Sequence, residues 1–314
     1  MSTADVVPSG GGPAEIELLA GMPAPRMAAA DGRSLALRRT NPPHPGDAPP
    51  VLLLHGVPET SLTWRHLMRA LGDERVVLAP DLAGLGESAL GGAYDLPAVA
   101  RTLEAFLAGE VGGTAVDVVG HDWGGGVALA LATASPGRVR RLVVISFPWH
   151  RVDVVRGFHI PLFAYGPPRV FERAGRKITS LMFRYAWKAP RPLEPAALRA
   201  YRNAYAEPER VDAMLGYYRA AVRRVKGSTN AGNAGRVADG QPPAGPSPER
   251  SLVVWGVRDP SVPLRSGEAV VRDLGRSAGP ASVQMLTVPG VGHWPHEEAP
   301  EVVTPAVAGF LLAP

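Results

Sequence analysis

The sequence of 314 residues contains no cysteine. This absence excludes disulfide bonds, thiolate metal sites and cysteine nucleophiles together. A chain without cysteine fits a reducing compartment, and we expect a cytoplasmic protein.

Long apolar runs are also missing from the sequence. No apolar run approaches the ~18 residues that a membrane span needs. The segment 1–13 has neither a basic start nor an apolar core, so it does not fit a signal peptide. We expect a disordered N-terminus over residues 1–14 and no membrane partner.

Lysine is scarce, because only Lys177, Lys188 and Lys226 are lysines among 33 basic residues. The arginines are scattered, and short clusters such as 138–141 are typical of solvated faces, so we expect no nucleic-acid partner. Abundant alanine, glycine, proline and arginine with little lysine indicate a GC-rich bacterial genome. The glycine-rich loops match neither a dinucleotide fingerprint nor a phosphate loop, and we expect no cofactor and no metal.

Strand-like and helix-like segments alternate along the first half of the chain. A hairpin is predicted over 26–39, with Asp31-Gly32 at its turn. Predicted strands and helices then alternate as 51–54, 61–71, 75–79, 96–107, 115–119, 125–134 and 140–146. This alternation predicts an α/β fold with a mostly parallel, doubly wound sheet.

The alternation breaks after Ser146. Residues 149–225 are rich in aromatic residues and arginine and look helical, and 226–250 look like a linker. Strands are predicted again at 252–255 and 283–286, and a final helix at 300–312. We therefore expect a core over 15–148 and 251–314, interrupted by a helical cap and linker over 149–250.

The run from Gly120 to Gly125, GHDWGG, lies between a predicted strand and a predicted helix. This context is typical of a nucleophile elbow, in which glycines flank the reactive residue in a tight turn. The reactive position holds Asp122, where an esterase would carry serine. A carboxylate attacks an sp3 carbon and leaves an alkyl ester, so Asp122 predicts epoxide opening or halide displacement. Ser88, Ser146 and Ser261 lack this context.

Hydrolysis of an alkyl ester requires a base and an acid that orients it. The predicted base is His293, between the last strand and the last helix, and His296 is a weaker alternative. The predicted acid is Asp259, just beyond the strand 252–255. The other possible acid position, after the strand 140–146, holds no carboxylate.

The oxyanion formed during hydrolysis requires backbone N–H donors. We expect these donors to be the amides of Val57 and Trp123, the first after a buried strand and the second directly after the nucleophile. His55 is predicted to be structural, and Asp81 and Glu87 are predicted to set loop geometry.

These motifs together resemble the α/β-hydrolase superfamily, and within it the epoxide hydrolase and haloalkane dehalogenase branch. The resemblance covers residues 25–150 and 250–312 and rests on five segments in order. They are His55 to Pro58, Asp81 to Ser88, Gly120 to Gly125, Trp255 to Asp259 and Gly292 to Trp294. It implies an α/β-hydrolase fold with a helical cap.

The resemblance to epoxide hydrolases also implies two cap residues that hold and protonate the epoxide oxygen. Met214 to Arg219 resembles the second of the two segments, which makes Tyr218 one donor, whereas Tyr217 is expected to pack. His159 occupies the position of the first, usually a tyrosine, with Tyr165 as the fallback. The residues expected to contact substrate are Trp123, Tyr165, Phe158 and Trp149.

The favoured hypothesis is an epoxide hydrolase that forms a vicinal diol through an ester on Asp122. A haloalkane dehalogenase is an alternative in which Trp123 and a cap tryptophan, Trp149 or Trp187, hold the halide. Val57 has no side-chain donor, which counts against halide release. A non-hydrolytic small-molecule binding or biosynthetic protein is the third alternative, and the oligomeric state stays open.

Overall fold

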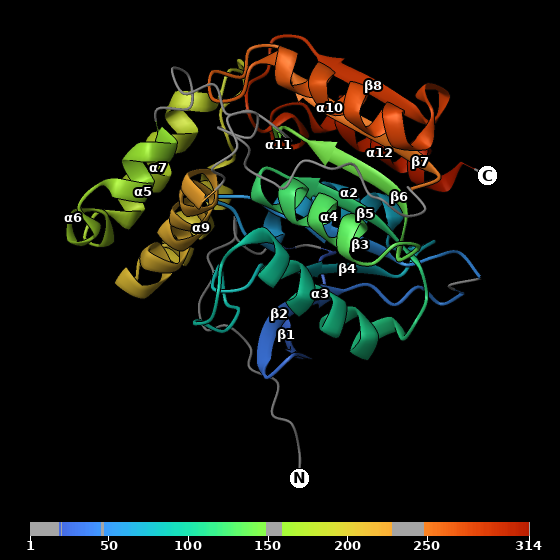
Figure 1. The fold of residues 1–314 in the computed structure, drawn as a ribbon, viewed down its shortest axis with the longest axis horizontal. Coiled ribbons are helices and arrows are strands. Elements are labelled where there is room, and N and C mark those ends of the chain that lie inside the picture. Colours follow the sequence, from blue (N-terminus) through green and yellow to red (C-terminus); the bar gives the residue numbers. More distant parts are fainter. Residues whose placement is uncertain (1–18, 20, 45–46, 149–158, 228–247, 314) are drawn as a thin grey trace.

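A computed structural model describes residues 19, 21–44, 47–148, 159–227 and 248–313 (Figure 1). The predicted disordered segment 1–14 lies outside these residues. Most of the predicted linker also lies outside them.

An eight-stranded sheet forms the core, in the order β1-β2-β4-β3-β5-β6-β7-β8. β2 runs antiparallel to both of its neighbours, whereas β3 to β8 are mutually parallel, as predicted. The strands are β1 (Arg26–Ala30), β2 (Arg33–Arg39), β3 (Val51–Leu54), β4 (Val77–Pro80), β5 (Val116–His121), β6 (Val139–Ile145), β7 (Arg250–Gly256) and β8 (Val283–Val288).

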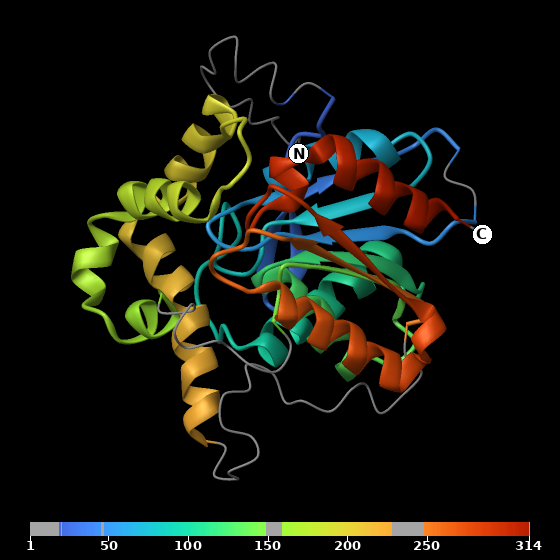
Figure 2. The same ribbon diagram turned by 90° about the horizontal axis from the view of Figure 1, so that it is seen from above.

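Helices cover both faces of the sheet, which explains the wholly apolar runs of its central strands. One face packs against α3 (Leu96–Val111), α4 (Trp123–Ala134) and α10 (Leu264–Ala278), and the other against α2 (Arg65–Leu71) and α12 (Pro300–Leu312). Figure 2 shows these two layers on either side of the strands.

The predicted hairpin, strands and final helix are confirmed within a few residues. The helix predicted over 61–71 begins with a 3-10 turn, η1 (Ser61–Trp64), before α2. α10 was not among the predicted elements. Few of its residues are buried, among them Val270 and Leu274, and its sequence is otherwise dominated by charged and small residues.

A group of five helices follows β6 and lies beside one end of the sheet (Figure 1). They are α5 (His159–Tyr165), α6 (Pro168–Glu172), α7 (Gly175–Ala186), α8 (Pro195–Ala204) and α9 (Pro208–Gly227). Phe183 of α7 packs on Trp294, which follows β8, with ring centroids 4.4 Å apart. The helices therefore lie beside the carboxyl ends of the strands, where the loops that carry the candidate site emerge, and we refer to these five helices as the cap.

Candidate active site

Asp122 occupies a sharp turn between β5 and α4. Its backbone has φ 47° and ψ −125°, a conformation that costs a non-glycine residue about 1–3 kcal/mol. A Cβ at Gly120 would lie 2.4 Å from the carbonyl oxygen of Gly124, and a Cβ at Gly124 would lie 2.1 Å from that of Leu54. Only glycine fits at these two positions, so the turn has the geometry predicted for a nucleophile elbow.

The two predicted oxyanion donors both act on the carboxylate of Asp122. The Val57 amide donates to Oδ1 at 3.0 Å, and Asp122 also precedes the first residue of α4, where the helix dipole favours a negative charge. The Trp123 amide is a second donor to this carboxylate. Such donors stabilise an anion on the carboxyl group without any rearrangement.

His293 and Asp259 meet at the ends of β8 and β7. The Nδ1 atom of His293 lies 2.7 Å from Oδ2 of Asp259. The other carboxylate oxygen, Oδ1, accepts hydrogen bonds from the amides of Ser261 at 2.8 Å and Val262 at 2.9 Å. The carboxylate is therefore fixed on both sides and orients the imidazole ring.

The second ring nitrogen of His293 faces the nucleophile. Nε2 lies 3.5 Å from Oδ2 of Asp122, the oxygen that does not face the Val57 amide. Burial would lower the pKa of His293, but Asp259 and Asp122 outweigh it and raise the pKa well above the ordinary histidine value. Burial would likewise raise the pKa of Asp122, but His293, His121 and the Trp123 amide lower it. The unliganded site is thus a carboxylate–imidazolium pair.

A cavity of about 160 Å³ adjoins this pair and extends beneath the cap. Its walls are mainly apolar side chains of α5, α6 and α7. The lining residues are Val57, Asp122, His159, Leu162, Phe163, Phe171, Ile178, Leu181, Met182, Tyr185, Ala186, Tyr218, Ser261, His293 and Trp294. Two hydrogen-bond donors predicted in the cap, His159 and Tyr218, therefore share a cavity with Asp122 and His293, the predicted nucleophile and base.

His159 and Tyr218 lie side by side in the cap wall, with ring centroids 6.2 Å apart. Burial and the charge of His293 lower the pKa of His159 to about 4, so the ring is neutral at pH 7. Burial and the charge of Asp122 raise the pKa of Tyr218, so its hydroxyl keeps its proton. Both groups are neutral hydrogen-bond donors.

Several predicted substrate contacts fall elsewhere. Tyr165 is 59% exposed and does not line the cavity, whereas His159 does, so the geometry favours His159 over the fallback Tyr165. Trp123 itself does not line the cavity, because its indole packs against Phe147, Tyr217 and the cavity-lining Tyr218, whose ring centroid lies 5.2 Å away.

The remaining predicted substrate contacts, Phe158 and Trp149, lie outside the described residues. Trp187, named as a halide donor, donates its indole N–H to the carbonyl of Arg191 and does not line the cavity. No tryptophan indole predicted to bind halide is therefore found at the cavity within the described part of the chain.

The residues expected to be structural form hydrogen bonds within the fold. His55 accepts from the Leu82 amide, and Asp81 accepts from the amides of Ser61 and Glu87. The Tyr217 hydroxyl donates to the carbonyl of Ala83, outside the cavity.

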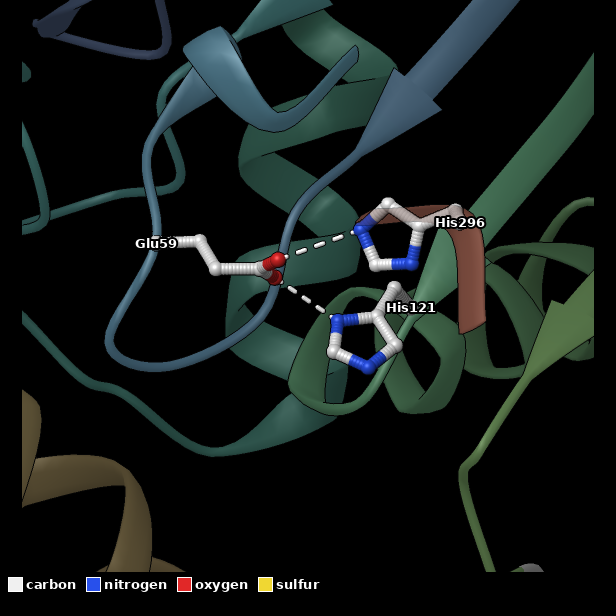
Figure 3. A group of neighbouring side chains, drawn as sticks. All are labelled: Glu59, His121 and His296. Carbon is white, nitrogen blue, oxygen red and sulfur yellow. Dashed lines mark hydrogen bonds and ion pairs between the residues drawn. The ribbon is translucent and has the colours of Figure 1, made fainter. Parts of the chain in front are cut away.

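Sequence reasoning missed a buried pair directly behind the base. Glu59, in the loop that carries the Val57 amide, points its carboxylate at the neighbouring rings of His121 and His296 (Figure 3). Its Oε2 is 2.7 Å from Nδ1 of His121, and its Oε1 is 3.1 Å from Nε2 of His296. Two sequence positions could have indicated this group: His121 directly precedes Asp122, and Glu59 lies two residues after Val57.

Hydrogen bonds occupy both ring nitrogens of His121. Its Nε2 lies 2.9 Å from the carbonyl oxygen of His293. Burial would raise the pKa of Glu59, but His121 and His296 lower it well below the ordinary value, so its carboxylate accepts. The His121 ring therefore connects Glu59 to the backbone of His293.

The side chains of Glu59, His121 and His296 are the one group among the described residues whose spacing would suit a metal ion, with ligand atoms within 4.8 Å of one another. Direct hydrogen bonds already join them, and Thr63 adds another by donating to Glu59 at 2.7 Å. The arrangement is that of a closed hydrogen-bond network.

Known proteins are similar to this chain in sequence. Residues 51–306 match the alpha/beta hydrolase family. Epoxide hydrolase 3 of Mus musculus is 24% identical over 281 residues, covering 85% of this chain and 71% of that protein. A haloalkane dehalogenase of Bradyrhizobium diazoefficiens is 37% identical over 136 residues, covering 43% of this chain and 40% of that protein. In two further epoxide hydrolases, the matched segments span only 28% and 41% of the relatives' length.

Solved structures show the same similarity. One of the epoxide hydrolases from metagenomes of hot environments aligns with a TM-score of 0.73 and 26% identity, covering 92% of this chain and 99% of that one. Within the described ranges, no helix is both long and apolar enough to cross a membrane. With more than half of its length matched, the chain belongs to the α/β hydrolase family, as an epoxide hydrolase-like member.

Proposed function

We propose that this protein is an epoxide hydrolase that forms a vicinal diol through an alkyl ester on Asp122. The observation that carries the proposal is the content of one cavity. Asp122, as the carboxylate nucleophile, and the charged His293 lie at the inner end of the cavity. The neutral donors Tyr218 and His159 line the side formed by the cap. Epoxide opening requires a nucleophile at carbon and an acid at oxygen, and the cavity holds both.

The first half of the proposed reaction uses Oδ2 of Asp122. This oxygen attacks one epoxide carbon, because Oδ1 is engaged by the Val57 amide. The carbon–oxygen bond of the epoxide breaks, and the oxygen takes the proton of Tyr218 while His159 donates a hydrogen bond. The product is a hydroxyalkyl ester of Asp122.

Esterification removes the negative charge of Asp122, and this loss makes His293 a base for the second half of the reaction. Asp122 is one of two carboxylates that raise the pKa of His293, so esterification lowers that pKa. The imidazolium proton then returns to the oxygen of Tyr218. His293 becomes a neutral base at the point where a base is required.

Hydrolysis of the ester restores the starting state. Water attacks the ester carbonyl carbon while His293 accepts its proton and Asp259 stabilises the resulting imidazolium. The amides of Val57 and Trp123 stabilise the oxyanion. The diol leaves, and the site returns to ionised Asp122, protonated His293 and neutral Tyr218.

The cavity favours apolar epoxides. Its volume of about 160 Å³ is similar to one that holds roughly one aromatic ring. Phe163, Phe171, Ile178 and Met182 line it, and none of them offers a strong hydrogen bond. We propose aryl and short alkyl epoxides as the substrate class, with the ring or chain against α5, α6 and α7.

The dehalogenase alternative rests on the similarity to the Bradyrhizobium haloalkane dehalogenase. Displacement of halide requires donors that hold the leaving ion. Val57 contributes only a backbone amide, and that amide faces Asp122. The indole of Trp123 does not line the cavity. Both observations favour the epoxide over the halide.

A non-hydrolytic binding or biosynthetic role receives less support than turnover. Binding alone does not require the carboxylate–histidine–carboxylate series of Asp122, His293 and Asp259, with its separations of 3.5 Å and 2.7 Å. The series suits ester formation followed by hydrolysis.

A single turnover of an aryl epoxide in H₂¹⁸O tests the proposal. The ester route predicts that the diol carries no ¹⁸O and that one ¹⁸O enters the peptide containing Asp122. Label in the diol after one turnover, with none in the protein, would show direct attack by water and contradict the proposal. Absence of diol from a broad panel of epoxides with folded protein would also count against it.

A further inference from the structure

The first three cap helices carry an excess of positive charge with almost no acidic residue among it. Residues 159–188, which include α5, α6 and α7, contain six basic residues and one acidic residue, whereas the net charge of the whole chain is only +4. The exposed basic residues are Arg169, Arg173, Arg176, Lys177 and Arg184. Glu172, the one acid, is only partly exposed.

Large apolar side chains are exposed on the same helices. They are Leu162 and Tyr165 on α5, Val170 on α6, and Leu181 and Tyr185 on α7. Five of the ten exposed large apolar side chains in the described ranges therefore lie within 24 consecutive residues. We call these exposed apolar and basic side chains of α5, α6 and α7 the cap surface.

Both kinds of side chain lie along one side of α7. Lys177, Leu181 and Tyr185 are spaced four residues apart, which places them on one helical face, and Arg184 lies beside them. The ammonium group of Lys188 lies 5.7 Å from the ring centroid of Tyr185. A helix face with cations among leucine and aromatic side chains is typical of helices that lie in a membrane interface.

The active-site cavity opens on the cap surface. Leu162, Leu181 and Tyr185 line the cavity and are also 46%, 55% and 40% exposed. The opening therefore lies between α5 and α7, and the cavity extends from it to Asp122. An apolar compound dissolved in a lipid layer against this surface would meet the opening directly.

We propose that the cap surface docks on membranes that contain anionic lipid. Its cations complement lipid phosphates, and its apolar side chains enter the boundary between headgroups and acyl chains. This contact is peripheral and does not require a spanning helix, so it replaces the expectation of no membrane partner, which rested on the lack of a long apolar run. Delivery of apolar substrate from the membrane rests on the proposed function, whereas the docking itself does not.

Charge favours this partner over a second copy of the chain. Two copies that met through the cap surface would bring ten exposed cations together, whereas an anionic bilayer neutralises them. Each basic residue near such a surface strengthens binding about fivefold, so the cluster suffices for a measurable affinity.

Cosedimentation of the full chain with vesicles tests the proposal. Phosphatidylcholine vesicles with phosphatidylglycerol should bind the protein, phosphatidylcholine alone should bind it far less, and added salt should weaken binding. The double variant Lys177→Glu/Arg184→Glu should bind at least about thirtyfold more weakly. Val170→Ser should lower binding about fivefold through loss of apolar contact.

A matched control carries the same change of net charge on the core. Arg101→Glu/Arg272→Glu alters exposed arginines of α3 and α10 and should bind vesicles like the original protein. Neither double variant touches the cavity lining, so both should hydrolyse a water-soluble epoxide at the original rate. If the original protein does not hydrolyse the epoxide, the proposed function is contradicted. Vesicle binding is a separate measurement and tests the docking proposal alone.

Three results would overturn the docking proposal. The first is equal binding to anionic and neutral vesicles, and the second is an equal loss of vesicle binding in the two double variants. The third is a protein that does not bind vesicles and that forms, in sedimentation equilibrium, a dimer that Val170→Ser dissociates. The last result would assign the cap surface to a second copy of the chain.

Discussion

The Nε2 atom of His293 lies 3.5 Å from Oδ2 of Asp122, and this separation serves two different purposes in the proposed reaction. Before substrate binds, the two groups form an ion pair that keeps Asp122 ionised as a nucleophile. After esterification, a water molecule must lie near His293 and the carbonyl carbon of Asp122. One histidine thus first stabilises the nucleophile and then serves as the base.

Replacement of Asp259 by asparagine separates the two half-reactions. The variant loses a carboxylate that raises the pKa of His293 and holds its Nδ1 hydrogen. Ester hydrolysis should slow about 10³- to 10⁴-fold, because the base loses its orientation and its counter-charge. Rapid mixing should show one equivalent of epoxide consumed without diol. Loss of that first equivalent as well would show that Asp259 acts before the ester forms.

Tyr218 and Tyr217 offer a matched pair on α9. Tyr218→Phe removes the proposed proton donor and should lower kcat by about 100-fold or more, with little effect on stability. Tyr217→Phe removes a hydrogen bond to Ala83 outside the cavity, so it should retain activity and lose about 1 kcal/mol of unfolding free energy. Steady-state kinetics and urea unfolding of both variants distinguish these roles. Equal kcat values in the two variants would exclude Tyr218 as the donor.

Glu59→Gln tests the buried network behind the base. Without the carboxylate, the contacts of Glu59 to His121 and His296 are broken, and the variant should lose about 3 kcal/mol of unfolding free energy. His121 is among the groups that lower the pKa of Asp122, and loss of its Glu59 partner should weaken that effect, so the acid limb of kcat/KM should move to higher pH. Glu110→Gln, which alters a pair with Arg26 and Arg39 far from the site, is the control. An unmoved acid limb in the folded variant would contradict the effect of His121 on the pKa of Asp122.

His159 predicts a loss of stability in acid. Its pKa falls from 6.5 to about 4 on folding, mainly through burial, so the unfolded chain binds a proton that the folded protein does not. The free energy of unfolding should therefore fall as the pH drops from 6.5 to 4, by about 2 kcal/mol from this residue. His66 contributes in the same direction, since burial lowers its pKa to about 4. His159→Gln should remove part of the loss in urea unfolding at pH 7 and pH 4.5, and an unchanged loss would contradict its burial in neutral form.

Local sequence patterns predict the sheet and the elbow. They also predict that Asp122, Asp259 and His293 each follow a strand. An apolar run predicts a buried strand, and two glycines around a polar residue predict a tight turn. The positions of backbone amides follow from the same turns, so the amides of Val57 and Trp123 could also be predicted from the sequence.

Side-chain directions in the cap were less predictable. The amide of Trp123 is fixed by the elbow, but its indole packs according to Phe147 and Tyr217, which are distant in sequence. Tyr165 lies at the end of α5, and packing of α5 on α9 turns it outward. The pair of Glu59 and His121 escaped notice because 62 residues separate them and neither forms a local motif.

The ester on Asp122 is the central claim, and trapping it is the most direct test. In a His293→Gln variant the base is absent, so the first half should proceed and the second should stall. Intact-protein mass after exposure to an aryl epoxide should rise by the mass of one whole epoxide, located on the peptide that contains Asp122. A rise by an alkyl group from a haloalkane, with none from epoxides, would point to dehalogenation. No adduct from epoxides on the folded variant would contradict the account.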